Sequence, residues 1–411
     1  MLKLPISLIL LFALQVAKAQ STLLQQNSWR VALERKDGRQ VIFGLSKTIE
    51  QEQLVLYVQN GADQVKVTDV ITAGDSLFFT MPVFESAFRV KQLPNGNIAG
   101  TLIKSTAASI QYWQLTGSPQ NGIRFPVSQG MPAGDITGKW KVDITRPNGT
   151  IRNAIAIFKQ EGNNLTGSFL TPSSDYRYLQ GVVTGDSVKL SSFDGDNARL
   201  FEAAIHTSGT TLSGIFYSGY NGQESWTAVK DDNVALPEIN DPTRLRPGQN
   251  SLNFTFNDLD GKEVSINDSA FKNKVVVVQL MGSWCANCLD ETRFLANYYK
   301  QNKDKGIAIV ALAYELTTDF ARSKKSVEKF KNLFGVTYPM LITGVTASDD
   351  QKAEKTLPQL TSVKSFPTTL FIDKKGNIRD IHTSFYGPAS GEFYTLSKNR
   401  FYETVDSLLA E

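Results

Sequence analysis

The sequence predicts an all-β region followed by an α/β domain. Within residues 28–230, short runs of alternating apolar and polar side chains recur, as at residues 53–58 and 211–216, and turn pairs such as Asn148-Gly149 separate them. From Ser251 onward, continuous apolar runs alternate with amphipathic stretches of helical length. A length of 411 residues is sufficient for the two or three domains that this change of pattern indicates.

Composition narrows the class of protein. Hydrophobic residues make up 41% of the chain and charged residues 20%, which is typical of a globular protein and not of a disordered one. The net charge is only +3, so we expect no nucleic-acid partner. With 2 His and 2 Cys in the chain, most metal sites with four nitrogen or sulfur ligands are excluded, and we expect neither a metal nor a cofactor.

Residues 1–19 have the pattern of a secretory signal peptide. Lys3 provides a positive start, residues 4–16 are mainly apolar, and Ala17-Lys18-Ala19 is a small-residue cleavage site. The alternative is a membrane anchor, but the apolar run is shorter than the ~20 residues that a membrane-spanning helix needs. We therefore expect an exported, soluble protein whose mature chain begins near Gln20, without lipid attachment because no Cys follows the cleavage site.

The β region contains a faint internal repeat. We interpret it as two related β units, residues 28–133 and 134–230, although similar β meanders can also match by chance. Neither unit contains a catalytic cluster, and their aromatic residues have the spacing of core side chains, so the ligand of the β units is unknown. One offset of 111 residues relates Trp29 to Trp140, Gly38 to Gly149 and Gly74 to Gly185, and after a short insertion residues 97–100 match residues 211–214.

Residues 231–250 are predicted to form a linker, because Pro and charged residues are frequent and no periodicity is present.

Residues 251–411 form the predicted α/β domain. The run at 275–281 is apolar throughout, as expected for a strand buried on both faces of a sheet. We predict strands at 252–256, 275–281, 307–313, 369–373 and 378–382, and helices from the Cys pair to about 302, at 320–334 and at about 397–409.

The candidate reactive residues lie in Cys285-Ala286-Asn287-Cys288, where a predicted buried strand is followed by a predicted helix. A disulfide between cysteines three positions apart closes too short a loop to stabilise the fold much, so the pair indicates chemistry. Cys285 would lie at the helix N-terminus, where free N–H groups and the helix dipole lower a thiol pKa from about 8.5. Cys288, one turn later, could then attack a mixed disulfide formed at Cys285.

Residues 251–411 resemble the thioredoxin fold, and most closely the exported thiol–disulfide oxidoreductases of the TlpA/ResA type. Three stretches carry the resemblance, namely VVVVQLMGSWCANC (275–288), CLDETRFL (288–295) and SFPTTLFIDKKGNI (365–378). The resemblance implies a redox-active disulfide between Cys285 and Cys288, a cis peptide bond before Pro367, and substrate contacts at Trp284, Phe366, Pro367 and Thr368. It covers only the C-terminal part of the chain.

The base that serves the second Cys is not the one found in thioredoxins. Thioredoxins have a buried Asp six residues before the first Cys, but Gln279 occupies that position here. ResA-like proteins have a Glu three residues after the second Cys, which corresponds to Glu291. The resemblance therefore assigns proton transfer to Glu291. The alternative is an exposed helix Glu paired with Arg293 or Lys300.

The preferred function is an exported thiol–disulfide oxidoreductase that reduces disulfides of extracytoplasmic proteins. Cys285 attacks the substrate disulfide, Cys288 resolves the mixed disulfide and Glu291 assists. The resemblance implies a membrane thiol carrier of the DsbD/CcdA type as electron donor, and together with the signal peptide it implies a periplasmic location. The opposite, oxidising direction stays open, since Ala286-Asn287 departs from the Gly-Pro or Glu-Pro pair commoner in relatives.

Two other functions compete with this one. A peroxiredoxin-type peroxidase needs a Thr three residues before its reactive Cys, where this chain has Gly282. A binding protein is the third possibility, in which the β units recognise a partner or glycan and the redox domain is auxiliary. Replacing Cys285 separates these readings, because only an enzyme would lose activity.

Overall fold

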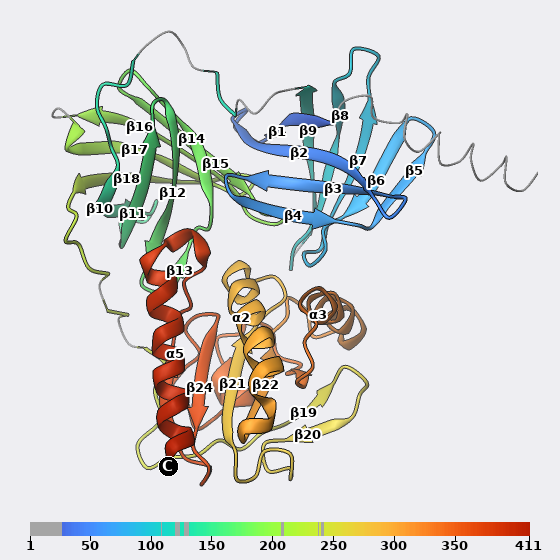
Figure 1. Ribbon diagram of the computed structural model, residues 1–411, viewed down its shortest axis with the longest axis vertical. Coiled ribbons are helices and arrows are strands. Elements are labelled where there is room, and N and C mark those ends of the chain that lie inside the picture. Colours follow the sequence, from blue (N-terminus) through green and yellow to red (C-terminus); the bar gives the residue numbers. More distant parts are fainter. Residues whose placement is uncertain are drawn as a thin grey trace, which may run out of the picture. The chain divides into compact units, whose positions relative to one another are not determined.

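The computed structural model describes residues 27–107, 109–119, 124–126, 131–206, 209–236, 238–239 and 242–411. The predicted signal peptide and the predicted start of the mature chain lie outside these residues. The chain divides into two compact units. The first contains the described residues up to Asp135, with Gln160–Thr166 and Tyr178–Trp226, and the second contains Ile136–Lys159, Gly167–Arg177 and Thr227–Glu411. Figure 1 shows the elements in chain order.

The first sheet comes from the first predicted β unit and confirms that this region is all β. Its nine strands have the order β4-β3-β2-β1-β9-β8-β7-β6-β5. Every neighbouring pair of strands in this sheet is antiparallel. The strands are β1 (Ser28–Glu34), β2 (Gln40–Glu50), β3 (Gln53–Asn60), β4 (Asp63–Val67), β5 (Val70–Ala73), β6 (Ser76–Thr80), β7 (Ser86–Gln92), β8 (Ile98–Ser105) and β9 (Ile110–Pro119).

The second sheet comes from the second predicted β unit. It also has nine strands, in the order β11-β10-β18-β17-β16-β15-β14-β12-β13, with an additional pairing of β11 with β12. The strands are β10 (Gly138–Thr145), β11 (Ile151–Glu161), β12 (Asn164–Thr171), β13 (Ser174–Asp175), β14 (Leu179–Thr184), β15 (Ser187–Phe193), β16 (Ala198–His206), β17 (Thr211–Ser218) and β18 (Gly222–Lys230).

The first two sheets share their strand arrangement and a glycine position that has no room for a side chain. These similarities support a duplicated β unit. In each sheet the first strand lies between the second and the last. A side chain at Gly100 on β8 would overlap the carbonyl oxygen of Arg89, and one at Gly214 on β17 would overlap that of Glu202. Both positions therefore accept only Gly, as a close approach of neighbouring backbone requires. The exact limits of the two β units, residues 28–133 and 134–230, stay predictions.

The third sheet belongs to the α/β domain and has the order β20-β19-β23-β22-β21-β24-β25. β21 pairs in parallel with β22 and antiparallel with β24. The predicted strands at 275–281, 307–313 and 378–382 are confirmed, whereas two short strands, β20 and β23, were not predicted. The strands are β19 (Thr255–Asp258), β20 (Glu263–Ser265), β21 (Val275–Met281), β22 (Ile307–Ala313), β23 (Met340–Ile342), β24 (Thr368–Ile372) and β25 (Ile378–His382).

The predicted strand at 252–256 is wrong by about three residues, because β19 begins only at Thr255. Leu252 and Phe254 are buried in the hydrophobic core without pairing as a strand. Their alternating pattern therefore reflects core packing and not a hydrogen-bonded ladder.

The helices of the α/β domain are α2 (Ala286–Asn302), α3 (Phe320–Phe334), α4 (Lys352–Thr356) and α5 (Glu392–Ala410), with short 3-10 turns η2 (Lys303–Lys305) and η3 (Pro388–Ser390). The predicted ends of α2 and α3 are confirmed. α5 begins five residues before the predicted start at Ser397. Its first turn is held by ring contacts of Phe393 with Tyr386 and of Tyr394 with Phe385, which a local pattern does not reveal. None of the helices in the described part of the chain has the length and apolar character that a membrane span needs.

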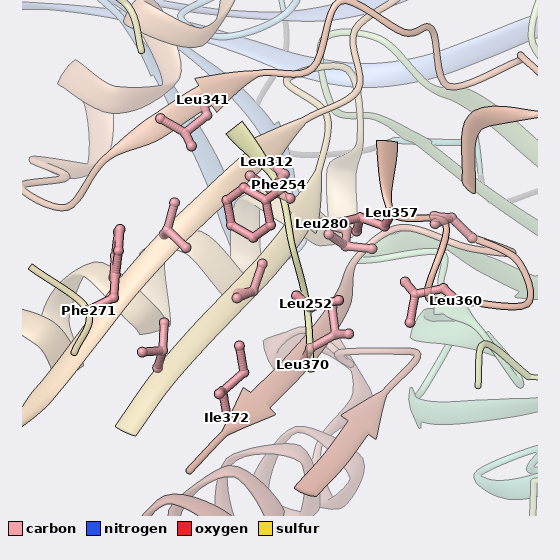
Figure 2. Close-up of a cluster of buried hydrophobic side chains, with 14 of the residues drawn as sticks. Leu252, Phe254, Phe271, Leu280, Leu312, Leu341, Leu357, Leu360, Leu370 and Ile372 are labelled. Carbon is pink, nitrogen blue, oxygen red and sulfur yellow. The ribbon is translucent and has the colours of Figure 1, made fainter. Parts of the chain in front are cut away.

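The two faces of β21 bury different groups. Val276, Val278 and Leu280 lie in the hydrophobic core shown in Figure 2, together with Leu312 and Leu370 from the neighbouring strands. Because side chains alternate along a strand, Gln279 points to the opposite face. On that face α2 and α5 meet through the rings of Phe294 and Phe401, and α5 runs beside β24 in Figure 1. The strand thereby presents Gln279 to α2.

The C-terminal part of the predicted linker packs on the α/β domain. Leu245 forms an isolated bridge with Leu360 and packs against the hydrophobic core. The backbone N–H of Arg246 donates to the carbonyl oxygen of Gln359 at 2.8 Å, and its guanidinium pairs with Glu354 at 2.9 Å. Residues from about 243 are thus structurally part of this domain.

Candidate active site

Cys285 lies at the N-terminus of α2, as the sequence predicts. It is the N-cap residue, and its Sγ accepts a hydrogen bond from the backbone N–H of Cys288 at 3.1 Å. Cys285 and Cys288 form a disulfide with their Cα atoms 5.2 Å apart. When the pair is reduced, the same N–H and the helix dipole would stabilise a thiolate on Cys285.

The loop that leads from β21 to α2 is held from the end of β22. The buried carboxylate of Glu315 accepts hydrogen bonds from the backbone N–H of Ser283 at 2.8 Å and from its hydroxyl at 2.6 Å. The indole N–H of Trp284 donates to the carbonyl oxygen of Tyr314 at 2.8 Å. These bonds fix the residues directly before the Cys pair. The only signal for the role of Glu315 in the sequence is its place after a buried strand.

The two cysteines differ little in exposure. The exposed fraction of Cys285 is 6% and that of Cys288 is 0%. Cys288 is enclosed, as expected for a resolving thiol. Cys285 is more enclosed than a nucleophile that must meet a second protein would ordinarily be, since reactive cysteines are typically partly exposed.

The residues expected to contact substrate lie in different environments. The peptide bond between Phe366 and Pro367 is cis, and the carbonyl oxygen of Phe366 lies 3.5 Å from Cys285 Sγ. Trp284 and Phe366 are half-buried, and their rings pack edge to face with centroids 5.7 Å apart. Pro367 is buried. Thr368 is fully buried, and its hydroxyl donates to the carbonyl oxygen of Ser365 at 2.8 Å. The side chain of Thr368 is therefore turned inward, whereas Trp284 and Phe366 form a surface beside Cys285.

Glu291 is buried, with 4% of its surface exposed, so the alternative of an exposed helix Glu is wrong. Its two oxygens accept hydrogen bonds from the amide of Gln279 and from the hydroxyl of Thr369, each at 2.7 Å. Burial raises the pKa of the Glu291 carboxyl to about 7, against the opposing effect of these two hydrogen bonds. Arg293, the partner considered in that alternative, lies instead over the ring of Phe334.

Gln279 and Thr369 were not predicted to serve the site. Gln279 also accepts a hydrogen bond from the hydroxyl of Thr292, which orients its amide N–H toward Glu291. Thr369 lies in the FPTT stretch, so its position two residues after Pro367 was the available signal. Across the described residues, no group of three or more His, Cys, Asp or Glu side chains is arranged to hold a metal ion.

Chemically, the site combines a disulfide-bonded Cys pair at a helix N-terminus with a carboxyl group whose pKa is about 7. Such a carboxyl can exchange a proton at neutral pH, and it follows Cys288 by one helix turn. The arrangement suits thiol–disulfide exchange.

Comparison with known proteins gives consistent matches for this part of the chain. Residues 247–381 match the AhpC/TSA family. The thioredoxin-like protein YneN of Bacillus subtilis (strain 168) is 29% identical over 41% of this chain and 84% of its own length. The thiol-disulfide oxidoreductase ResA of Bacillus thuringiensis (strain Al Hakam) is 30% identical over 34% of this chain and 70% of its own length. Among solved structures, a putative protein disulfide isomerase from Bacteroides thetaiotaomicron matches with 22% identity and a TM-score of 0.30, over 40% of this chain and 93% of that one.

Proposed function

The chain belongs, through its C-terminal domain, to the family of thiol–disulfide oxidoreductases that includes ResA, and we propose that it reduces disulfides of exported proteins with the dithiol of Cys285 and Cys288. The observation that carries the proposal is the Cys pair at the N-terminus of α2, with Cys285 as the N-cap residue. The resemblance of the flanking motifs favours the reducing direction.

The proposed reaction has two steps. The thiolate of Cys285 attacks one sulfur of the substrate disulfide, which breaks the substrate bond, forms a mixed disulfide and releases the other substrate sulfur as a thiolate. Cys288 then attacks Cys285 Sγ, which forms the Cys285–Cys288 disulfide and frees the second substrate thiol. Two electrons pass from the dithiol to the substrate in one cycle.

Glu291 takes the role of proton acceptor in this proposal. Cys288 is a thiol before the second step and must lose a proton to attack. Glu291 lies one turn further along α2, and its carboxyl pKa of about 7 allows it to accept that proton at neutral pH and to release it later. Gln279 and Thr369 hold the carboxylate in place.

The proposed reaction also needs a compartment, a surface that contacts the substrate and an electron donor. We place the protein in the periplasm after removal of residues 1–19, with Trp284 and Phe366 contacting the substrate chain and with Pro367, which is buried, shaping the adjoining backbone. Thr368 would contribute through its backbone, since its side chain is buried. The dithiol must be regenerated by an external dithiol, and a membrane thiol carrier of the DsbD/CcdA type is the donor class that the family resemblance favours.

The test is reduction of insulin disulfides by the full mature chain, with dithiothreitol as the donor. We expect Cys285→Ser to abolish catalysis, and Cys288→Ser to accumulate a mixed disulfide that mass spectrometry detects, because only the first step remains. Wild-type protein without dithiothreitol is the control for turnover. Activity that survives in Cys285→Ser would refute the proposal, and dithiol-dependent consumption of hydrogen peroxide without insulin reduction would indicate a peroxidase instead.

A further inference from the structure

A short segment of the β region lies on the first turn of α2. This covering segment, residues 171–177, includes the end of β12 and all of β13, and it belongs to the same compact unit as the α/β domain. The carboxylate of Asp175 accepts hydrogen bonds from the side-chain amide of Asn287 at 3.0 Å and from the backbone N–H of Gly387 at 2.6 Å. Asn287 is one of the two residues between the cysteines.

Arg177 adds an ion pair and a second bond to the same turn. Its guanidinium donates to the carbonyl oxygen of Ala286 at 3.0 Å and pairs with the carboxylate of Asp290 at 2.8 Å. Arg177 and Asp290 are both buried. Asp175 also accepts a hydrogen bond from the backbone N–H of Arg177 at 2.7 Å, so the two side chains are positioned together. Both residues that separate the cysteines are thus bonded to the covering segment.

The start of the covering segment is held by a third contact. The hydroxyl of Tyr386 lies 2.9 Å from the carbonyl oxygen of Thr171 and 3.1 Å from that of Pro172. Tyr386 directly precedes Gly387, which bonds Asp175. The segment is therefore bound to two parts of the α/β domain, the first turn of α2 and the loop before α5.

These contacts bury the surface that would ordinarily meet a substrate. Ala286 and Asn287 are each only 7% exposed, and Cys285 is 6% exposed. A protein disulfide that reaches Cys285 must bring its own chain against this turn of the helix. We propose that the covering segment selects substrates by size: in the closed arrangement Cys285 reacts with small disulfides and thiol reagents, and a macromolecular partner requires the Asp175 and Arg177 contacts to open. The biological meaning of this filter rests on the proposed function, since it concerns the same Cys285.

The test compares a small and a large maleimide at Cys285 in the full chain. In the Cys288→Ser background Cys285 is the one thiol in the sequence, so N-ethylmaleimide and a 5-kDa polyethylene glycol maleimide report on the same sulfur. Both reagents react with the thiolate, and the ratio of their rate constants therefore cancels any change in the pKa of Cys285. We expect the Asp175→Ala/Arg177→Ala double variant to increase the relative rate of the large reagent about tenfold, because it loses the bonds that favour the closed state.

A second variant opens the segment without removing a charge. Gly387 has ordinary extended backbone, with φ of −81°, but a side chain there would overlap the carboxylate of Asp290 and come within 3.5 Å of that of Asp175. We expect Gly387→Ala to shift the ratio in the same direction as the double variant. Arg246→Ala is the control, because it removes an Arg–Glu ion pair in which neither the covering segment nor α2 takes part, and its ratio of rate constants should equal that of the parent.

The outcomes separate this proposal from the proposed function. An unchanged ratio in both opening variants, each checked by circular dichroism to be folded, would overturn the size filter even if insulin reduction is normal. A shifted ratio in a protein that reduces no insulin in any variant would leave the filter in place and refute the proposed function. A shift together with faster insulin reduction in the opening variants is the result that we expect.

Discussion

Glu291 and Gln279 form a buried hydrogen-bonded pair in the candidate active site. The sequence shows Gln279 where thioredoxins have a titrating Asp, which suggests only that a base is missing. Glu291 could be assigned by resemblance, but its environment could not. In the structure the side-chain amide of Gln279, on β21, donates a hydrogen bond to the carboxylate of Glu291, on α2. Such a contact between β21 and α2 has no signature in sequence spacing.

The proton-transfer role of Glu291 predicts a specific pH dependence. Below pH 7 the carboxyl is protonated and cannot accept the proton of Cys288, so the rate of the resolving step should rise as pH increases through about 7. In Glu291→Gln we expect this rise to be lost and the rate at pH 7.5 to fall by about 10²-fold, the usual contribution of a positioned base. Stopped-flow fluorescence of a preformed mixed disulfide measures the step. An unchanged profile in the variant would exclude Glu291 as the base.

The pH dependence of the free energy of unfolding tests the pKa of Glu291 independently of catalysis. The folded-state pKa of Glu291 is about 7, above the ordinary carboxyl value of 4.5, so between these values the folded protein holds a proton that the unfolded chain releases. The free energy of unfolding must therefore fall as pH rises from about 4.5 to 7, by about 3 kcal/mol from this group. Urea unfolding at pH 4 and pH 8 should show a smaller loss in Glu291→Gln than in the wild type. An equal loss in both proteins would mean that the carboxyl is not protonated in the folded state near neutrality.

At the scale of elements, the sequence predicted well those segments that are long and uniform. β21 and β22 are apolar over seven residues, and α3 has a regular amphipathic pattern, an Asp319 cap and a terminal Gly335, so their ends are confirmed. β20 and β23 have only three residues each, and tertiary pairing alone makes them strands. The early start of α5 likewise depends on ring contacts made by Phe393 and Tyr394.

If the two β units are duplicates, as we propose, Gly100 and Gly214 should be equally intolerant of a side chain. A methyl group at either position would overlap backbone of the adjacent strand, so Gly100→Ala and Gly214→Ala should each reduce the free energy of unfolding by about 1–3 kcal/mol. Gly134→Ala is the control, because its nearest neighbour would be 3.8 Å away. Urea unfolding of the three variants tests this. If one of the two strand glycines tolerates Ala as Gly134 does, the two positions are not structurally equivalent.

For the whole molecule, the sequence predicted the order of an all-β region and an α/β domain, but not the contacts of Asp175 and Arg177 with α2. Cys285 and Cys288 could be identified from the WCANC motif, and Pro367 from the FPTT stretch further along the chain. Asp175 and Arg177 could not, because they lie more than 100 residues before Asn287 and belong to a region that shows no catalytic pattern. The contact requires the folded positions of both segments, and no local periodicity encodes it.

The reduction potential of the Cys285–Cys288 couple in the full chain decides whether the protein can work as a disulfide reductase. The protein would be equilibrated with glutathione or dithiothreitol mixtures, and its thiols trapped and counted by mass spectrometry. We predict one reversible two-electron couple below about −220 mV, toward the value of about −270 mV for thioredoxin, as a reductase requires. A value near the −120 mV or so of DsbA would reverse the direction of the reaction, and the absence of a reversible couple would contradict the account of the site.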